Sequence, residues 1–126
     1  MAKTENHKIN FRLPLPPSKN KQHAIVGNRV YNTKAVKDYQ KLVEQILRLE
    51  LQLHKIFIKE SKIVIWCSWF IGRKGIDCVN FHDQLADSIK KAIDIDDQWF
   101  LIRDYDFEIV GKNGKSGVEI EMYYKD

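Results

Sequence analysis

The sequence predicts an α+β fold in which two helices pack on a mixed β-sheet. Three observations predict it: four segments have the pattern of strands, two repeat their apolar residues at helical spacing, and turn residues separate them. The expected order along the chain is β-α-β-α-β-β. A chain of 126 residues can bury a core of its own, so we expect one domain over residues 1–126.

The first predicted strand covers residues 9–15, where every second residue is apolar and one face can be buried. Pro16 and Pro17 end it, because proline cannot donate to a β-ladder. Residues 18–33 are polar and basic and contain the turn signal Gly27-Asn28, which favours a loop or a short β-ribbon.

Both predicted helices follow from apolar residues spaced three or four apart. The first runs from an N-cap at Thr33 to about Leu51, with an apolar face of Val36, Tyr39, Val43, Ile46 and Leu47. The second covers about Val79 to Ile93, and its apolar stripe contains Phe81, Leu85, Ile89 and Ala92. A polar stripe beside it contains Asn80, Asp83, Asp87 and Lys91.

The remaining strands lie within residues 56–71, 101–109 and 118–124. The segment from Ile63 to Ile71 is apolar on both parities, which is typical of a central strand or of one buried at a dimer interface. The last two segments alternate apolar and polar residues, and the turn signal of residues 111–114 joins them.

The composition is that of a globular protein, with 44% hydrophobic and 30% charged residues. A net charge of +4 favours polyanionic partners. Cys67 and Cys78 form neither a zinc motif nor a disulfide framework, which fits a reducing compartment. Residues 1–10 are too polar for a signal peptide, and the apolar run Ile63 to Ile71 is shorter than the ~20 residues of a membrane-spanning helix. We therefore expect a cytoplasmic protein without membrane association.

Acidic residues concentrate between Asp77 and Asp106. Asp77 precedes the second helix, Asp83 and Asp87 lie on one face of it, and Asp96 and Asp97 follow it. A tight turn after the helix could bring Asp97 back toward Asp77. Carboxylates that converge in this way suit Mg²⁺, which prefers oxygen ligands and can activate water for phosphodiester hydrolysis. The alternative is that these residues stabilise helix ends or cover solvated faces, and that His82 is a surface or packed residue.

Basic residues flank this acidic segment. Lys19, Lys21 and Arg29 cluster before the first helix, and Arg73 and Lys74 lie just before Asp77. Basic side chains beside a metal site would hold phosphates near the metal, whereas the alternative is a solvated loop. The three tryptophans are interpreted as core or interface residues rather than as platforms for bases: Trp66, Trp69 and Trp99.

These motifs resemble the RusA family of Holliday junction resolvases over nearly the whole chain. Residues 13–20 read L-P-L-P-P-S-K-N and resemble that family's opening L-P-x-P-P-S-x-N, which Tyr39 and Val43 continue as Y-x-x-x-V. Residues 77–80, D-C-V-N, resemble its D-x-D-N. Asp87 falls at the Asp of its D-A-L segment, and Asp96-Asp97 falls at its D-D.

The resemblance implies a homodimeric, Mg²⁺-dependent endonuclease that cuts four-way DNA junctions in recombination and repair. The family's first carboxylate corresponds to Asp77, and the one at its D-D corresponds to Asp97. Two positions depart from the family: Val79 stands at the second Asp of D-x-D-N, and Asp83 stands at a lysine. A valine side chain cannot bind metal, so Asp83 could supply the missing carboxylate from the next helical turn.

The resulting hypothesis assigns catalysis to Asp77, Asp83 and Asp97. Asp87 is expected to join them as a metal ligand or to orient a water, with Asn80 and Asp96 in support. The residues expected to bind the DNA backbone are Lys19, Lys21, Arg29, Arg73 and Lys74. One alternative is a RusA-like protein that holds branched DNA without cutting it, and another is a protein-interaction domain whose acidic residues only face solvent.

Overall fold

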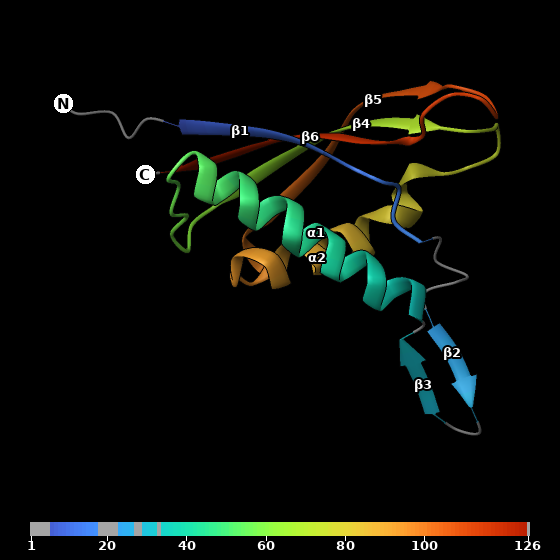
Figure 1. Ribbon diagram of the computed structural model, residues 1–126, viewed down its shortest axis with the longest axis horizontal. Coiled ribbons are helices and arrows are strands. Elements are labelled where there is room, and N and C mark those ends of the chain that lie inside the picture. The colour runs from blue at the N-terminus through green and yellow to red at the C-terminus, as the bar shows by residue number, and fades with distance from the viewer. Residues whose placement is uncertain (1–5, 18–22, 27–28, 33, 126) are drawn as a thin grey trace.

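The computed structural model describes residues 6–17, 23–26, 29–32 and 34–125, and it has the α+β architecture that the sequence predicts. A four-stranded mixed sheet and two α-helices make up its main body, and α1 and α2 lie on the same side of the sheet (Figure 1). A separate two-stranded hairpin lies away from the sheet, near the first residues of α1 (Figure 1).

The main sheet has the strand order β1-β6-β4-β5. Its strands are β1 (Asn6–Leu13), β4 (Ile63–Ile71), β5 (Phe100–Ile109) and β6 (Gly117–Lys125). β6 pairs antiparallel with both β1 and β4, whereas β4 and β5 run parallel. The strand that is apolar on both parities, β4, is therefore an inner strand, as the first of its two interpretations predicts.

Alternation along the strands places one face of the sheet under the helices. In β4 the odd-numbered residues from Ile63 to Ile71 are buried, and the even-numbered ones are half-buried on the other face. The helices close the core from the opposite side, since Val43 and Leu47 of α1 and Leu85 and Ile89 of α2 have no exposed surface. The core therefore lies between the sheet and the helix pair.

α1 spans Lys34–Leu53 and α2 spans His82–Ile93. The hydroxyl of Tyr39 in α1 donates a 2.8 Å hydrogen bond to the carbonyl of Pro14, which fixes the helix to the end of β1, and burial raises the pKa of this tyrosine. Between the helices, the amide of Gln40 donates to Asp87 at 3.3 Å and its carbonyl accepts from Lys91 at 2.9 Å. Among the described residues, neither helix is long and apolar enough to cross a membrane.

Some boundaries differ from those that the sequence predicts. β1 ends at Leu13 rather than Leu15, because Pro14 has no N–H to continue the ladder. The basic segment before α1 contains the hairpin of β2 (His23–Val26) and β3 (Arg29–Asn32), the short ribbon that was one of two expectations. Thr33, the predicted N-cap, lies outside the described residues.

The second helix begins later than its apolar pattern indicates. Residues Cys78–Phe81 form a 3₁₀ turn, and the α-helix starts only at His82. Its C-cap Asp94 takes a left-handed conformation with φ of 57°. A second short 3₁₀ turn, Asp97–Trp99, then leads into β5. The prediction that Asn80 and Asp83 project from one continuous helix is therefore wrong, since only Asp83 belongs to α2.

The buried face of α2 gives a test of this packing. Replacing Ile89 by alanine should lower the free energy of unfolding by about 2–5 kcal/mol, because it removes a fully buried aliphatic side chain and leaves a cavity. Urea unfolding followed by circular dichroism measures this change. Leu53→Ala is the matched control, since Leu53 is 66% exposed, and an equal loss in the two variants would contradict the packing of α2.

Candidate functional site

A pocket lies where the residues that follow β4 meet the middle of β5. Its volume of about 430 Å³ falls within the range of roughly 300–1,000 Å³ that is usual for small-molecule sites. Two aspartates from distant parts of the sequence, Asp77 and Asp104, line it together with Asp106. The other lining residues are Trp69, Ile76, Cys78, Tyr105 and Phe107.

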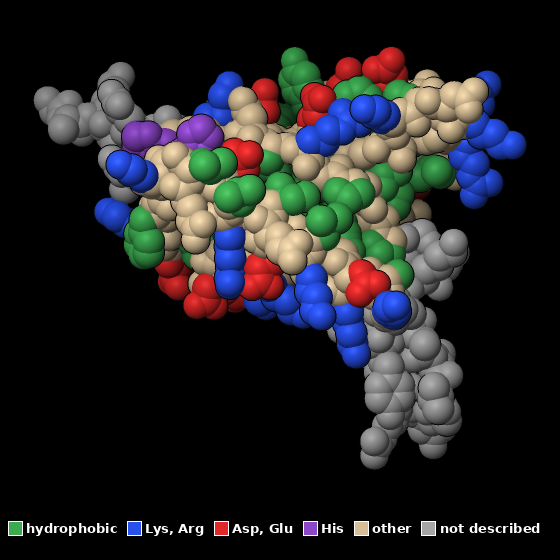
Figure 2. Space-filling model, in the orientation of Figure 1, with side chains coloured by type: hydrophobic (Ala, Val, Ile, Leu, Met, Phe, Trp, Pro, Cys, Tyr) green, Lys and Arg blue, Asp and Glu red, His purple; other side chains and the backbone are tan. Residues whose placement is uncertain are grey.

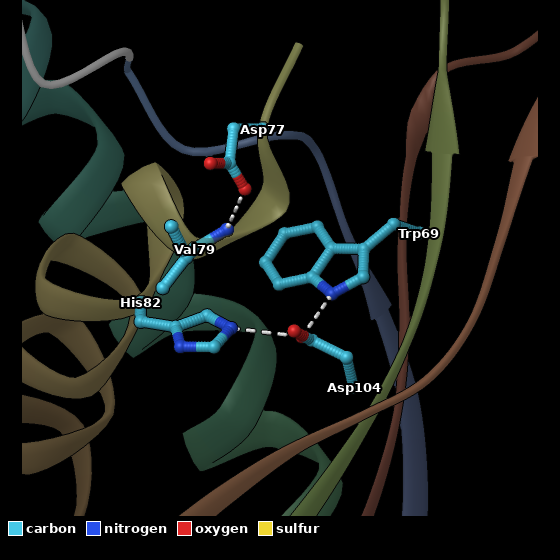
Figure 3. Close-up of polar contacts among 5 residues, drawn as sticks. All are labelled: Trp69, Asp77, Val79, His82 and Asp104. Carbon is cyan, nitrogen blue, oxygen red and sulfur yellow. Dashed lines mark hydrogen bonds and ion pairs between the residues drawn. The ribbon is translucent and has the colours of Figure 1, made fainter.

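Asp104 is held in place by hydrogen bonds from two other elements. The indole nitrogen of Trp69 in β4 donates to Oδ1 of Asp104 at 2.7 Å. Nε2 of His82, the first residue of α2, lies 2.8 Å from the same oxygen and donates to it, because a carboxylate only accepts (Figure 3). No described residue donates to Oδ2 of Asp104, so that oxygen remains available to a ligand.

Trp69 connects the start of α2 to the sheet. Its side chain has no exposed surface, and its ring stacks on Phe81 at 5.4 Å and on His82 at 6.1 Å between centroids. The strand register brings Asp104 to it, because Cys67 pairs with Asp104 and Ser68 pairs with Asp106, which leaves Tyr105 as an extra residue. This irregularity re-aims the strand beside the pocket, as bulges near functional sites often do.

Asp77 is fixed by the turn that precedes α2. It is the N-cap of the 3₁₀ turn Cys78–Phe81, and its Oδ1 accepts a 3.2 Å hydrogen bond from the backbone nitrogen of Val79. The pKa of the Cys78 thiol is raised, first by burial and then by the negative charges of Asp104 and Asp77. Burial also raises the pKa of Cys67 to about 12, with smaller contributions from Asp104 and Cys78.

The other predicted metal ligands lie elsewhere. The hydrogen bond from Lys90 to Asp96, 3.2 Å long, raises the pKa of that lysine, and the charges of Asp96, Asp97 and Asp87 add to the effect. The same contact lowers the pKa of Asp96. Lys90, in the C-terminal part of α2, therefore pairs with Asp96 and is also affected by the charges of Asp97 and Asp87.

The two groups of carboxylates are separated by α2. The helix has 12 residues and is about 18 Å long, with Asp77 before its start and Asp97 beyond its end. Asp97 also precedes β5, whose first residue is about 13 Å along the strand from Asp104. The predicted return of Asp97 to Asp77 does not occur. Within the described residues, no three His, Cys, Asp or Glu side chains lie close enough together to hold a metal ion.

The remaining predicted residues are spread around the pocket and beyond it. Asp83 is exposed in the first turn of α2, Asn80 is exposed in the preceding 3₁₀ turn, and neither lines the pocket. Arg73 and Lys74 are exposed in the segment that leads to Ile76 and Asp77. Arg29 belongs to β3, while Lys19 and Lys21 lie outside the described residues.

The sequence pattern did not identify the residues that complete the pocket. In the sequence, Asp104 is one polar position in an alternating strand, Trp69 is interpreted as a core or interface residue, and His82 is interpreted as a surface or packed residue. The parallel pairing of β4 with β5 brings them together, and pairing between strands so distant in the chain is not visible in the spacing of either one. The acidic composition of residues 77–106 was the one available signal.

Comparison with known proteins gives no further guidance: no family model matches the chain, and the search of curated proteins finds no significant match.

The hydrogen bond between Trp69 and Asp104 can be tested through stability. Asp104→Ala should lower the free energy of unfolding by about 1–3 kcal/mol, because the buried indole N–H loses its acceptor. Chemical denaturation with tryptophan fluorescence as the signal measures the change. Asp106→Ala is the control and should cost clearly less, since among the described residues Asp106 accepts only from the neighbouring backbone nitrogen of Phe107. Equal effects would contradict the bond.

Proposed function

We propose that this protein is a cytoplasmic, Mg²⁺-dependent endonuclease that hydrolyses phosphodiester bonds in branched DNA such as four-way junctions. One observation carries the proposal: Asp77 and Asp104 line the same pocket, each with one carboxylate oxygen that accepts no hydrogen bond from a described residue. The basic segment with Arg73 and Lys74 leads directly to this pocket. The resemblance of the sequence motifs to the RusA family supports the same activity.

The donor set of the pocket fits magnesium. Mg²⁺ keeps several waters and is commonly held by one or two carboxylates together with phosphate oxygens of the substrate. Aspartates such as Asp77 and Asp104 are therefore ligands of the right type, and a third protein ligand is not required. Cys78 also lines the pocket, but its raised pKa keeps the thiol protonated, and hard oxygen ligands are preferred by this ion.

The chain's own residues have distinct roles in this proposal. Asp77 and Asp104 would hold the ion, and Trp69 and His82 would keep Asp104 oriented. Arg73 and Lys74 would contact backbone phosphates on the approach to the pocket. When bound, Mg²⁺ supplies charge neutralisation at the phosphate and lowers the pKa of a coordinated water.

The other carboxylates of the sequence-based hypothesis lie outside the pocket. Asp96 pairs with Lys90, and the charges of Asp97 and Asp87 also act on this lysine. Asp83 lies one residue beyond His82, at the N-terminal end of α2, where the helix dipole favours an anion. Each of Asp83 and Asp104 could replace the carboxylate that Val79 lacks, and the pocket favours Asp104.

The central test is cleavage of a synthetic four-way junction in the presence of Mg²⁺. Asp77→Asn should reduce the cleavage rate by more than about a hundredfold, because losing a metal ligand should cost more than losing an outer-shell partner of one. The variant should leave junction binding nearly unchanged. Gel analysis of labelled strands measures cleavage, and fluorescence anisotropy measures binding. Asp38→Asn on the exposed side of α1 is the matched control. Full activity of Asp77→Asn would rule out this site.

Comparison of two further variants assigns the second carboxylate. If Asp104 binds the ion, Asp104→Asn should abolish Mg²⁺-dependent cleavage while Asp83→Asn retains it. The reverse result would show that Asp83 replaces the carboxylate lost at Val79. Isothermal titration with Mg²⁺ distinguishes loss of metal affinity from loss of a later step.

The second candidate function is binding of branched DNA without cleavage. Val79 favours it, because an apolar side chain that is 55% exposed stands beside Asp77, where the resembling family has a carboxylate (Figure 3). In that case the wild-type protein should bind junctions tightly and leave them intact.

Val79→Asp tests this second candidate. The exposed position tolerates a charge, and the new carboxylate would add an oxygen ligand near Asp77. We expect Mg²⁺-dependent cleavage to appear, or its rate to increase at least about tenfold. Changes in the outer shell of a metal site typically alter activity by at least this factor. Val79→Asn is the control without the charge, and equal rates for the two variants would contradict a metal-binding role for this position.

We also propose that the protein acts as a homodimer, since a four-way junction has two-fold symmetry and needs paired cuts. The face of the sheet opposite the helices exposes part of Trp66 and Phe70 of β4, and Trp66 meets Tyr105 edge to face at 6.1 Å between ring centroids.

Light scattering tests the homodimer and should give twice the mass of the chain, and Trp66→Glu should shift the protein to the monomer. Phe57→Glu, at a position that is 85% exposed outside the sheet, should leave the mass unchanged, and a monomeric wild type would contradict the proposal.

A further inference from the structure

Two basic loops leave the sheet at the same end. One joins β4 to the turn before α2 and carries Arg73 and Lys74, and the other joins β5 to β6 and carries Lys112 and Lys115. The backbone nitrogen of Val110 donates to the carbonyl of Ile71 at 2.8 Å, which joins the loops at their bases. A Cβ atom on Gly72 would lie 3.9 Å from the carbonyl oxygen of Gly111, so the chains run in contact there.

The second loop has a defined shape. Gly111 has a φ of 78° and its carbonyl accepts from Gly114 at 3.2 Å, which closes a tight turn. A Cβ on Gly114 would approach the carbonyl oxygen of Val110 to 2.3 Å, so only glycine fits at this position. Lys112 lies within this turn, so its backbone position is fixed before any partner binds.

Arg12 fixes the far side of the same loop. Its guanidinium donates to the carbonyl of Lys115 at 2.8 Å, forms an ion pair with Glu119 at 3.1 Å, and lies 4.8 Å from the ring centroid of Phe70. Arg12 therefore neutralises one acidic residue near the loop, Glu119, and orders the loop backbone. The ammonium group of Lys115 takes no part in these contacts.

The four side chains of the two loops form one basic surface, which we call the loop-end surface: Arg73, Lys74, Lys112 and Lys115. All four are exposed, and none forms an ion pair with a described residue. Lys and Arg side chains gather at this end of the molecule in Figure 2, where Figure 1 shows the two loops. Unpaired cations on an ordered backbone are suited to a polyanion.

We propose that the loop-end surface binds the sugar-phosphate backbone of a DNA arm, with Lys112 and Lys115 extending the contact that Arg73 and Lys74 begin. The surface is continuous with the pocket, because Asp77 follows the first loop and Phe107 precedes the second, and both residues line the pocket. A duplex held there would place phosphates beside the two aspartates. This inference rests on the proposed function for its ligand, but it does not require that the DNA be cut.

The test measures the salt dependence of binding to a fluorescent four-way junction and to a linear duplex. Lys112→Gln/Lys115→Gln should flatten the slope of log Kd against log salt concentration by about 1 for each lysine. Affinity near 0.1 M salt should fall on the order of tenfold for each lost contact. Junction and duplex should respond alike, because phosphate contacts do not read the branch point.

The control is Lys59→Gln/Lys62→Gln, which removes two exposed charges before the first residue of β4, at the opposite end of the sheet. These variants should keep the wild-type slope. Equal slopes for the two double variants would overturn the loop-end surface, as would a wild type that binds neither DNA. Binding with the predicted slopes but without cleavage would support the surface and reject the nuclease. A wild type that cleaves, with unchanged slopes for Lys112→Gln/Lys115→Gln, would support the nuclease and reject the surface.

Discussion

The parallel pairing of β4 with β5 is the constraint on which the rest of the structure depends. Parallel neighbours cannot be joined by a tight turn, so the chain must cross over from one end of the sheet to the other, and α2 makes that crossing. The crossover starts with Asp77 and His82 close to the end of β4. Because β5 then runs beside β4 in the same direction, its middle residue Asp104 reaches the place where the crossover began.

The fold could be derived from the sequence because its signals are local. Alternation from Ile9 to Leu13 and from Val118 to Tyr124, and the helical repeat from Val36 to Leu47, each reflect burial of one face. The predicted boundaries of helices and strands are wrong where local backbone chemistry competes with the pattern of apolar residues. Pro14 shortens β1, and Asp77 caps a 3₁₀ turn and so delays the start of α2 to His82.

The site was only partly derivable, because its geometry is a property of pairings between distant segments. Asp77 could be identified from its place before a helix, and it does line the pocket. Its partner could not, since Asp104 owes its position to the register beside Cys67 and to the extra residue Tyr105. Asp97, the expected partner of Asp77, does not lie beside it, because a straight helix of 12 residues separates its two ends by about 18 Å.

The position of β5 at the edge of the sheet has a consequence for contact with other chains. Among the described strands it has a neighbour on one side only, and it exposes apolar side chains such as Phe107, at 62%. Such an edge invites pairing with another chain, and natural proteins discourage this with charged side chains. Here four charged residues lie along that strand: Arg103, Asp104, Asp106 and Glu108. The carboxylates beside the pocket therefore lie on the strand edge where charge discourages pairing with another chain.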